Sequence, residues 1–189
     1  MADGHLGIWA AFGEMHPTGT EQRCWNHKIA NVLNDLPKTV QRQAAERLKA
    51  MPYAEPQGEC ERRRDAFVRT YHKTDKKAVE TLLRDGDRMV TFYAFPREHW
   101  RHLRTTTIVE SPFSSVRLRT DASRRYKRVA GATAIIWKML RVAEQAWRTL
   151  NVSELLPLVA SGMTFKDGIA LKSGHERNHL DHQPERTAA

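Results

Sequence analysis

Three short segments hold the residue types that could carry chemistry. Asp3 stands in the sequence DGHLG, Glu110 follows RTTTIV, and between them QRCWNHK, at residues 22–28, holds a cysteine and a histidine. Carboxylates are hard oxygen ligands that suit Mg²⁺ and Mn²⁺. Taken alone, however, Asp3 is typical of a solvated chain end, and Glu110 is typical of an acid at a helix N-terminus, where the dipole stabilises it.

Cys24 and His27 have a spacing that also occurs in zinc sites. A structural zinc site needs four ligands, and the second cysteine, Cys60, has no histidine or cysteine at ligand spacing beside it. We therefore expect Cys24 and His27 to lie on adjacent turns of a helix and to hydrogen-bond or pack there. Histidines with ligand-like spacing in polar surroundings, predicted to be solvated, are His175, His179 and His182.

The charge of the chain favours a polyanionic partner. The 31 Lys and Arg residues outnumber the 22 Asp and Glu residues, which gives a net charge of +9 and a pI near 9.9. Nucleic acid is the usual polyanion for such an excess, because binding releases counterions. Residues 97–128 contain nine basic residues against three acidic ones, so most of the excess flanks Glu110. The alternative to nucleic-acid binding is that these basic residues lie on helix faces that only contact solvent.

The elements that must position these residues are mainly helical. The apolar stretch 7–12 predicts a short helix, which places Asp3 in the loop that leads into it. Apolar residues at helical spacing predict longer helices over 25–36, 40–51 and 131–150. The last of these is the clearest amphipathic helix. The run 89–94 fits a helix or a strand, and its helical surroundings favour a helix.

Composition limits the class of protein. With 40% hydrophobic and 28% charged residues the chain is globular in type, and its two cysteines are too few for a disulfide scaffold. No stretch is apolar over the roughly 18 residues that a membrane span needs, and the N-terminus has no signal-peptide pattern. We expect no membrane partner and a cytoplasmic, nucleoid-associated protein.

The three segments, in this order and at these separations, resemble the catalytic half of the Mutator-type transposases of bacterial insertion sequences. Asp3-Gly4 looks like the second-carboxylate motif of that family, and residues 22–28 match its Cys-x-x-His signature. The sequence TFYAFPREHWRHLRTT, at residues 91–106, resembles the approach to the third carboxylate, which would be Glu110. The likeness covers residues 3–168, nearly the whole chain outside its tail.

The resemblance implies a mainly α fold, in which an incomplete RNase H-like α/β core carries a helical insertion domain. Residues 1–22 would be the remnant of the core that carries the second carboxylate, and residues 23–103 would form the helical insertion domain. Residues 104–168 would be returning core helices with the third carboxylate, and residues 169–189 a disordered tail.

The resemblance also implies a reaction, which is metal-dependent DNA strand cleavage followed by attack of a 3′-hydroxyl on target DNA. Asp3 and Glu110 would be catalytic members of a DDE triad that holds Mg²⁺ or Mn²⁺. The first Asp of the triad has no counterpart, since the chain begins at Met1, so we expect a C-terminal piece of a transposase. Thr107 stands where the family usually has Asn.

DNA is then the expected partner, both as insertion-sequence ends and as target, with a homo-oligomer or a full-length transposase as further partners. Phosphate contacts are predicted for Arg104, Arg117, Arg119, Arg124, Arg125, Lys127 and Arg128. Core packing is predicted for Trp100, Phe113, Trp137 and Trp147. Two alternatives to an active transposase remain: a non-catalytic DNA-binding or regulatory remnant, and a decayed inactive fragment.

Overall fold

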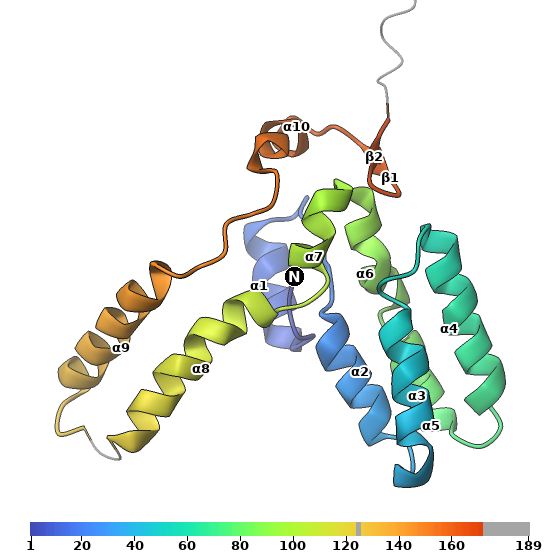
Figure 1. The fold of residues 1–189 in the computed structure, drawn as a ribbon, viewed down its shortest axis with the longest axis horizontal. Coiled ribbons are helices and arrows are strands. Elements are labelled where there is room, and N and C mark those ends of the chain that lie inside the picture. The colour runs from blue at the N-terminus through green and yellow to red at the C-terminus, as the bar shows by residue number, and fades with distance from the viewer. Residues whose placement is uncertain (124–125, 172–189) are drawn as a thin grey trace, which may run out of the picture.

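The computed structural model describes residues 1–123 and 126–171, and the chain in this part is mainly helical, as predicted (Figure 1). Its elements, with η for 3₁₀ helices, are α1 (Leu6–Met15), α2 (Trp25–Asn34), α3 (Lys38–Ala50), α4 (Gln57–Tyr71), α5 (Lys76–Leu83), α6 (Gly86–Val90), η1 (Thr91–Ala94), η2 (Arg97–His99), α7 (Trp100–Leu103), α8 (Thr107–Ala122), α9 (Val129–Glu144), η3 (Ser153–Leu155), α10 (Leu156–Ala160), β1 (Phe165–Lys166) and β2 (Ile169–Ala170).

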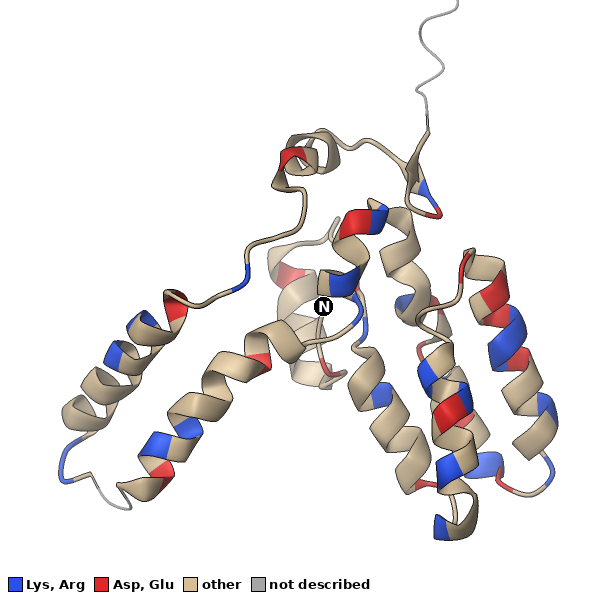
Figure 2. Ribbon diagram, viewed as in Figure 1, with Lys and Arg blue, Asp and Glu red and all other residues tan. Residues whose placement is uncertain are grey.

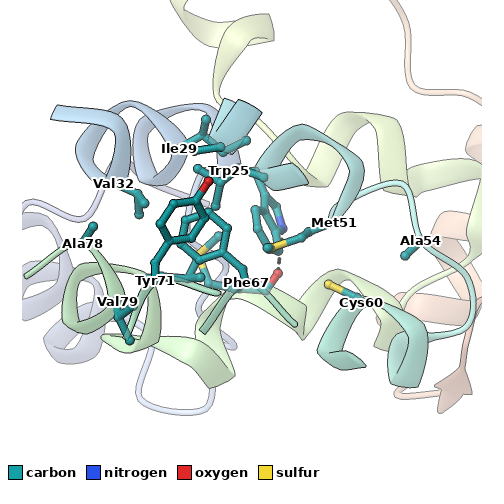
Figure 3. Packing of buried hydrophobic residues seen from close by; sticks show 14 of the residues in the cluster. Trp25, Ile29, Val32, Met51, Ala54, Cys60, Phe67, Tyr71, Ala78 and Val79 are labelled. Atoms are coloured by element: carbon teal, nitrogen blue, oxygen red, sulfur yellow. Dashed lines mark hydrogen bonds between the residues drawn. The ribbon is translucent and has the colours of Figure 1, made fainter. Parts of the chain in front are cut away.

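The main core lies among α2, α3, α4 and α5 (Figure 3). Trp25, Ile29 and Val32 recur at helical spacing on α2 and are all buried, so this helix packs one apolar face inward. The rings of Phe67 and Tyr71, one turn apart on α4, lie 4.5 Å apart between centroids and fill the space opposite. The helices predicted over 25–36 and 40–51 are confirmed.

A cluster of aromatic rings from η1 and α7 extends this core. Phe92 and Tyr93 in η1 are buried, and the indole of Trp100 meets the Phe92 ring edge-on at 5.4 Å between centroids. The indole N–H of Trp25 donates to the carbonyl oxygen of Met89 at 2.9 Å, which fastens α2 to α6. The helical assignment of 89–94 and the burial of Trp100 are therefore confirmed.

Helices α8 and α9 form a hairpin that points away from the α2–α5 bundle (Figure 1). The predicted helix over 131–150 is present as α9 but ends at Glu144, and none of its residues is buried by the described part of the chain. Core packing was a wrong prediction for Phe113, Trp137 and Trp147, whose exposed fractions are 45%, 62% and 52%. The apolar face that the periodicity predicts is present, but α8 covers it only in part: Met139, Leu140 and Ala143 are half-buried, while most of α9 is exposed.

The C-terminal part of the described chain returns to the bundle through a small antiparallel hairpin, in which Phe165 pairs with Ala170 and Lys166 with Ile169. Gly168 has a φ of +80°, and a Cβ there would lie 2.7 Å from the Cβ of Arg97, so the turn requires glycine. β2 lies within the segment predicted as a tail, and the rest of that tail, with His175, His179 and His182, lies outside the described residues.

Sheet structure in the described part consists of this hairpin and one parallel bridge between Ala2 and Arg23. The prediction of a mainly α fold is confirmed. The RNase H-like core and the division into four segments stay predictions.

Candidate catalytic site

The loop that carries Asp3 is fixed beside the first turn of α2. Ala2 donates its N–H to the carbonyl of Gln22 at 3.0 Å and accepts the N–H of Cys24 at 2.8 Å, so the chain pairs like a strand at this point. Asp3 follows directly, and its Oδ1 accepts the N–H of His5 at 3.0 Å, just before α1 begins. The prediction that Asp3 lies in a loop leading into a helix is confirmed.

Gly4 shapes the turn after Asp3. Its φ is +95°, and a Cβ at this position would lie 1.7 Å from Nη1 of Arg23. Only glycine takes this backbone conformation without strain, and only glycine lets the Arg23 guanidinium pass so close. The dipeptide Asp3-Gly4 therefore has a structural reason: the glycine turns the chain where the carboxylate must stand beside α2.

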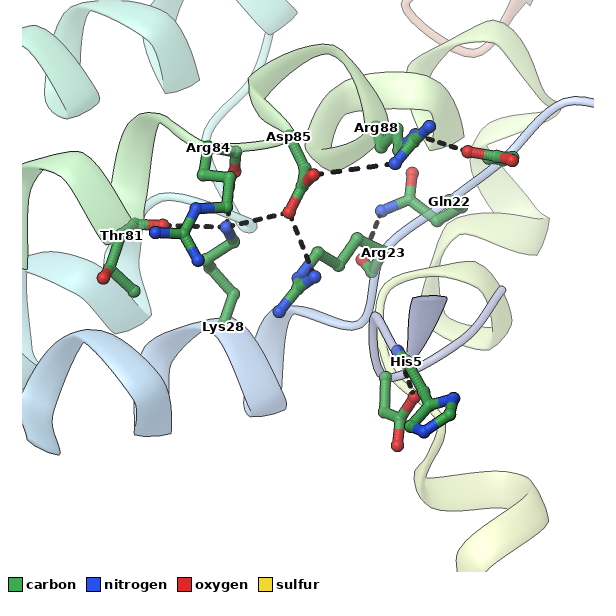
Figure 4. A network of polar contacts seen from close by, with 10 residues as sticks. His5, Gln22, Arg23, Lys28, Thr81, Arg84, Asp85 and Arg88 are labelled. Carbon is green, nitrogen blue, oxygen red and sulfur yellow. Dashed lines mark hydrogen bonds and ion pairs between the residues drawn. The ribbon is translucent and has the colours of Figure 1, made fainter. Parts of the chain in front are cut away.

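A buried ionic network holds the start of α2 against the connection between α5 and α6 (Figure 4). Asp85 Oδ2 lies 3.0 Å from Nη1 of Arg23 and 3.4 Å from Nζ of Lys28, and Lys28 also donates to the carbonyl of Thr81 at 2.8 Å. Lys28 is 1% exposed, and this burial lowers its pKa to about 8, against the raising effect of the Asp85 charge. No spacing pattern in the sequence relates Asp85 to Arg23 or Lys28, so local patterns did not predict this network.

Cys24 and His27 join the start of α2 to the start of α8. Cys24 is the N-cap residue of α2, and its Sγ accepts the backbone N–H of Thr106 at 3.3 Å. The Thr106 hydroxyl lies 3.2 Å from the same sulfur and 3.4 Å from Nδ1 of His27. The expectation that Cys24 and His27 hydrogen-bond or pack together at the start of a helix is confirmed. No pattern in the sequence indicates that Thr106 is their shared neighbour.

The backbone and neighbouring side chains strengthen this junction. Trp25 donates its N–H to the carbonyl of Arg104 at 2.9 Å. Asn26 Nδ2 donates to the hydroxyl of Thr107 at 3.1 Å. Thr107 stands where the resemblance predicts Asn, and its hydroxyl links α8 to α2. The first turn of α8 is thus attached to α2 at several points.

Glu110 lies in that first turn of α8, where its N–H donates to the carbonyl of Thr106. Its Oε1 accepts a short hydrogen bond from the Thr106 hydroxyl and lies 3.7 Å from Nδ1 of His27. Its side chain is 47% exposed, so the carboxylate is held on one side and open to solvent on the other.

The electrostatics of the site converge on His27. Its pKa is raised by the interaction with Cys24, and further by the negative charges of Glu110 and Asp3, while burial opposes the shift. Burial by itself would raise the pKa of the Cys24 thiol, but interactions with Thr106 and His27 outweigh it, and the pKa is lowered. Asp3 and Glu110, distant in sequence, therefore act on the same imidazole.

The donor set fits a divalent metal in part. Asp3 and Glu110 offer hard carboxylate oxygens of the kind that Mg²⁺ and Mn²⁺ prefer, and Glu110 is open to solvent. Within residues 1–123 and 126–171, however, no three His, Cys, Asp or Glu side chains gather closely enough to hold a metal ion. These two residues could thus supply some of the six ligands that octahedral Mg²⁺ needs, with the others coming from water or from elsewhere.

The predicted phosphate contacts fall into two groups. Arg117 and Arg119, in the last turns of α8, and Lys127 and Arg128, just before α9, are exposed. Figure 2 shows basic residues gathered at this free end of the hairpin, away from the α2–α5 bundle. Arg124 and Arg125, which complete the predicted set in this region, lie outside the described residues.

Arg104 has surroundings of another kind. Its guanidinium carbon lies 4.9 Å from the ring centroid of Tyr53, 5.2 Å from that of Phe92 and 5.5 Å from that of Trp100. Burial lowers the pKa of Arg104, and its Nε has no hydrogen-bond partner among the described residues. These contacts assign Arg104 to packing against aromatic rings. A phosphate contact by Arg104 stays a prediction that its surroundings do not favour.

A groove of about 490 Å³ opens between the first half of α8 and the segment after α9. The walls of this groove are mainly apolar. Local sequence patterns do not predict the groove, because it forms only where α8 packs against α9 and the segment after α9. It is lined by Thr107, Ile108, Val109, Ser111, Pro112, Phe113, Leu140, Ala146, Trp147 and Arg148.

Comparison with known proteins adds an independent line of evidence. A family model described as "Transposase, Mutator family" matches residues 1–149. The chain is 40% identical over 169 residues to the transposase for insertion sequence element IST2 of Acidithiobacillus ferrooxidans, which covers 89% of this chain and 57% of the relative. It is 38% identical over 172 residues to the transposase for IS6120 of Mycolicibacterium smegmatis, which covers 91% of this chain and 53% of the relative.

The chain thus spans about half the length of these curated relatives. No solved structure matches it. Among the described helices, none is both long enough and apolar enough to cross a bilayer.

Proposed function

Since the chain belongs to the Mutator family of transposases, we propose that it supplies two of the carboxylates with which a transposase cuts and joins DNA during transposition of an insertion sequence. The single observation that carries the proposal is the convergence of Asp3 and Glu110 on His27. We infer that the strand-like pairing of Ala2 and the helical start of α8 hold these two acids near one another, although they come from distant segments.

Asp3 and Glu110 would hold a divalent cation, Mg²⁺ or Mn²⁺, which when bound activates an attacking oxygen and stabilises a leaving one in phosphoryl transfer. The chain's own residues prepare this site. Gly4 turns the chain so that Asp3 stands beside α2, and α8 presents Glu110 from its first turn. The remaining acid, the first Asp of the DDE triad, would come from outside these 189 residues.

We propose that these 189 residues act as part of a larger protein, which consists of one chain or of two. The RNase H-like sheet implied by the family resemblance would lie outside the described residues and would cover the apolar faces of α8 and α9. Two observations support this: the relatives are nearly twice as long as the match, and Trp137 and Val142 on α9 are 62% and 58% exposed. An exposed apolar face of this kind usually marks a contact surface.

Binding of Mn²⁺ by the purified chain, followed by electron paramagnetic resonance of the free ion, tests the metal site. We expect Asp3→Asn and Glu110→Gln each to weaken Mn²⁺ binding about tenfold or more, because each removes a charged ligand. Glu46→Gln is the matched control, since Glu46 is an exposed acid on α3, a helix that carries neither of the proposed metal ligands. Equal affinity in all four proteins would remove the metal site from the proposal.

A second readout locates the ion. Fe²⁺ in the place of Mg²⁺, with ascorbate and peroxide, cleaves the backbone near the bound ion, and we expect cuts near Asp3 and Glu110 that excess Mg²⁺ suppresses. Cuts spread evenly over the acidic surface residues would mean that Fe²⁺ binds nonspecifically to surface carboxylates and not at Asp3 and Glu110.

A second candidate function, a DNA-binding or regulatory polypeptide without catalysis, is favoured by one observation. The exposed basic residues at the free end of the α8–α9 hairpin stand apart from Glu110 (Figure 2). They could bind DNA phosphates in a chain that lacks a complete active site. The two functions separate experimentally, because DNA binding by this end should not require Asp3 or Glu110.

A further inference from the structure

Thr106 is a buried polar residue with an unusual set of contacts. It is 9% exposed and is the N-cap residue of α8, four positions before Glu110. An N-cap hydroxyl normally accepts a hydrogen bond from a backbone N–H in the first turn of its helix. Within the described residues the Thr106 hydroxyl makes no such bond and instead donates to Oε1 of Glu110. The cap hydrogen bond is replaced by one to an acidic side chain.

The surroundings of Thr106 fix where this donor stands. Its backbone N–H donates to Sγ of Cys24 at 3.3 Å, and Cys24 is fully buried. Its hydroxyl oxygen lies 3.2 Å from the same sulfur and 3.4 Å from Nδ1 of His27. A hydroxyl has one hydrogen to donate, and the Glu110 carboxylate is a stronger acceptor than the Cys24 sulfur, so the hydrogen lies towards Glu110. The oxygen is then free to accept from its neighbours on α2.

We propose that Cys24, His27 and Thr106 form a positioning unit, which holds the Glu110 carboxylate on the side of α8 that faces α2 and the Asp3 loop. Cys24 fixes the backbone of Thr106, Thr106 fixes one oxygen of Glu110, and His27 lies against the same oxygen at 3.7 Å. The inference rests on the proposed function, since it gives the Cys-x-x-His segment a task at the proposed metal site.

The physical need for such a unit follows from the exposure of Glu110. A glutamate on a helix surface samples several rotamers, and a half-exposed one has little packing to select among them. Hydrogen bonds from neighbouring residues fix the orientation of metal ligands in proteins, and their loss typically weakens metal binding by 10- to 100-fold. Because Thr106 acts through Glu110, it is a positioning residue and not a catalytic one.

The test compares Thr106→Val, which keeps the shape and loses the hydroxyl, with Thr106→Ser, which keeps the hydroxyl. A metal-free readout comes first: side-chain coupling constants of Glu110 measured by nuclear magnetic resonance. We expect one dominant rotamer in the natural chain and in Thr106→Ser, and averaged couplings in Thr106→Val. With Mn²⁺, we expect Thr106→Val to bind about tenfold more weakly and Thr106→Ser to restore binding.

His27→Ala serves as a second variant if Thr106→Val does not fold, because the His27 side chain is 39% exposed and its loss leaves the core intact. His27→Ala should also broaden the rotamer distribution of Glu110.

Two results separate the inference from the proposed function. Unchanged couplings and unchanged Mn²⁺ binding in both Thr106→Val and His27→Ala would overturn the inference. Loss of Mn²⁺ binding in Asp3→Asn and Glu110→Gln would still leave the proposed function standing. Failure of those two acid variants to affect Mn²⁺ would remove the metal site, and the metal-free couplings would still decide whether Thr106 positions Glu110.

Discussion

Nζ of Lys28 lies 3.4 Å from Oδ2 of Asp85, in a site where the lysine side chain is 1% exposed. The same carboxylate oxygen lies 3.0 Å from the Arg23 guanidinium, so one acid stands against two cations at the base of α2. A buried cation that shares its counter-ion is poorly compensated, and burial is the largest cause of the lowered pKa of Lys28. This pair connects the stability of the fold to pH.

The free energy of unfolding should increase from pH 8 towards pH 10.5. The pKa of Lys28 is about 8 in the folded chain and near 10.5 when unfolded, so the unfolded state binds more protons in this window and stability rises with pH. The full gain is on the order of 3 kcal/mol and is lost as the pH falls through 8. Urea unfolding at pH 7.5 and 9.5 measures it. Lys28→Met should lack the rise, and an equal rise in both proteins would contradict the assignment.

Gly4→Ala should disturb the Asp3 loop. A methyl group at position 4 meets the Arg23 guanidinium at 1.7 Å, and the φ of +95° is strained for any other residue. We expect the unfolding free energy to fall by about 1–3 kcal/mol and Mn²⁺ binding to weaken. Gly13→Ala is the control, because Gly13 lies within α1 with nothing within 4 Å of the added Cβ. That change should leave Mn²⁺ binding unaltered and stabilise the chain by about 0.5–1 kcal/mol.

The sequence predicted local structure well because helical periodicity is a local property. The apolar spacing of Ile29 and Val32 specified both the helix and the face that packs inward. Asp3 before a helix and Glu110 on a helix were likewise local predictions, and both are confirmed. The family resemblance predicts that the two acids come together. Their shared electrostatic effect on His27 depends on tertiary packing, which no local spacing rule predicts.

What the sequence could not supply were contacts between distant segments. Thr106 meets Cys24 across 82 positions of the chain, and no spacing rule relates the two residues. In the sequence, Arg104 does not differ from the other residues of the basic cluster. An arginine guanidinium is flat and weakly hydrated, so it can also pack on aromatic rings. Only the fold shows which rings lie near Arg104. Asp85 stands between α5 and α6, and its ionic partners are Lys28 on α2 and Arg23 just before that helix.

The apolar face of α9 supports a prediction about stability. Trp137→Ala should change the unfolding free energy by less than about 0.5 kcal/mol, because a side chain that is 62% exposed loses little on removal. Trp100→Ala, the matched control with a 2% exposed indole, should cost about 3–5 kcal/mol. Binding of a hydrophobic dye should fall in Trp137→Ala at unchanged stability. A large stability loss in Trp137→Ala would mean that α9 is covered in solution by this chain or by a second copy.

The free end of the α8–α9 hairpin provides the test that separates DNA binding from catalysis. Removing Arg117 and Arg119 together should weaken binding to all duplex sequences alike and should lower the slope of log K against log salt by about 2, since each basic residue releases about one counterion from the phosphates. Fluorescence anisotropy at several salt concentrations measures both the affinity and the slope.

The matched control removes Arg42 and Lys49, two exposed cations of α3, and should leave the slope unchanged. Equal losses in the two double variants would mean that net charge alone attracts DNA. A loss confined to one sequence would instead assign the two arginines to base contacts.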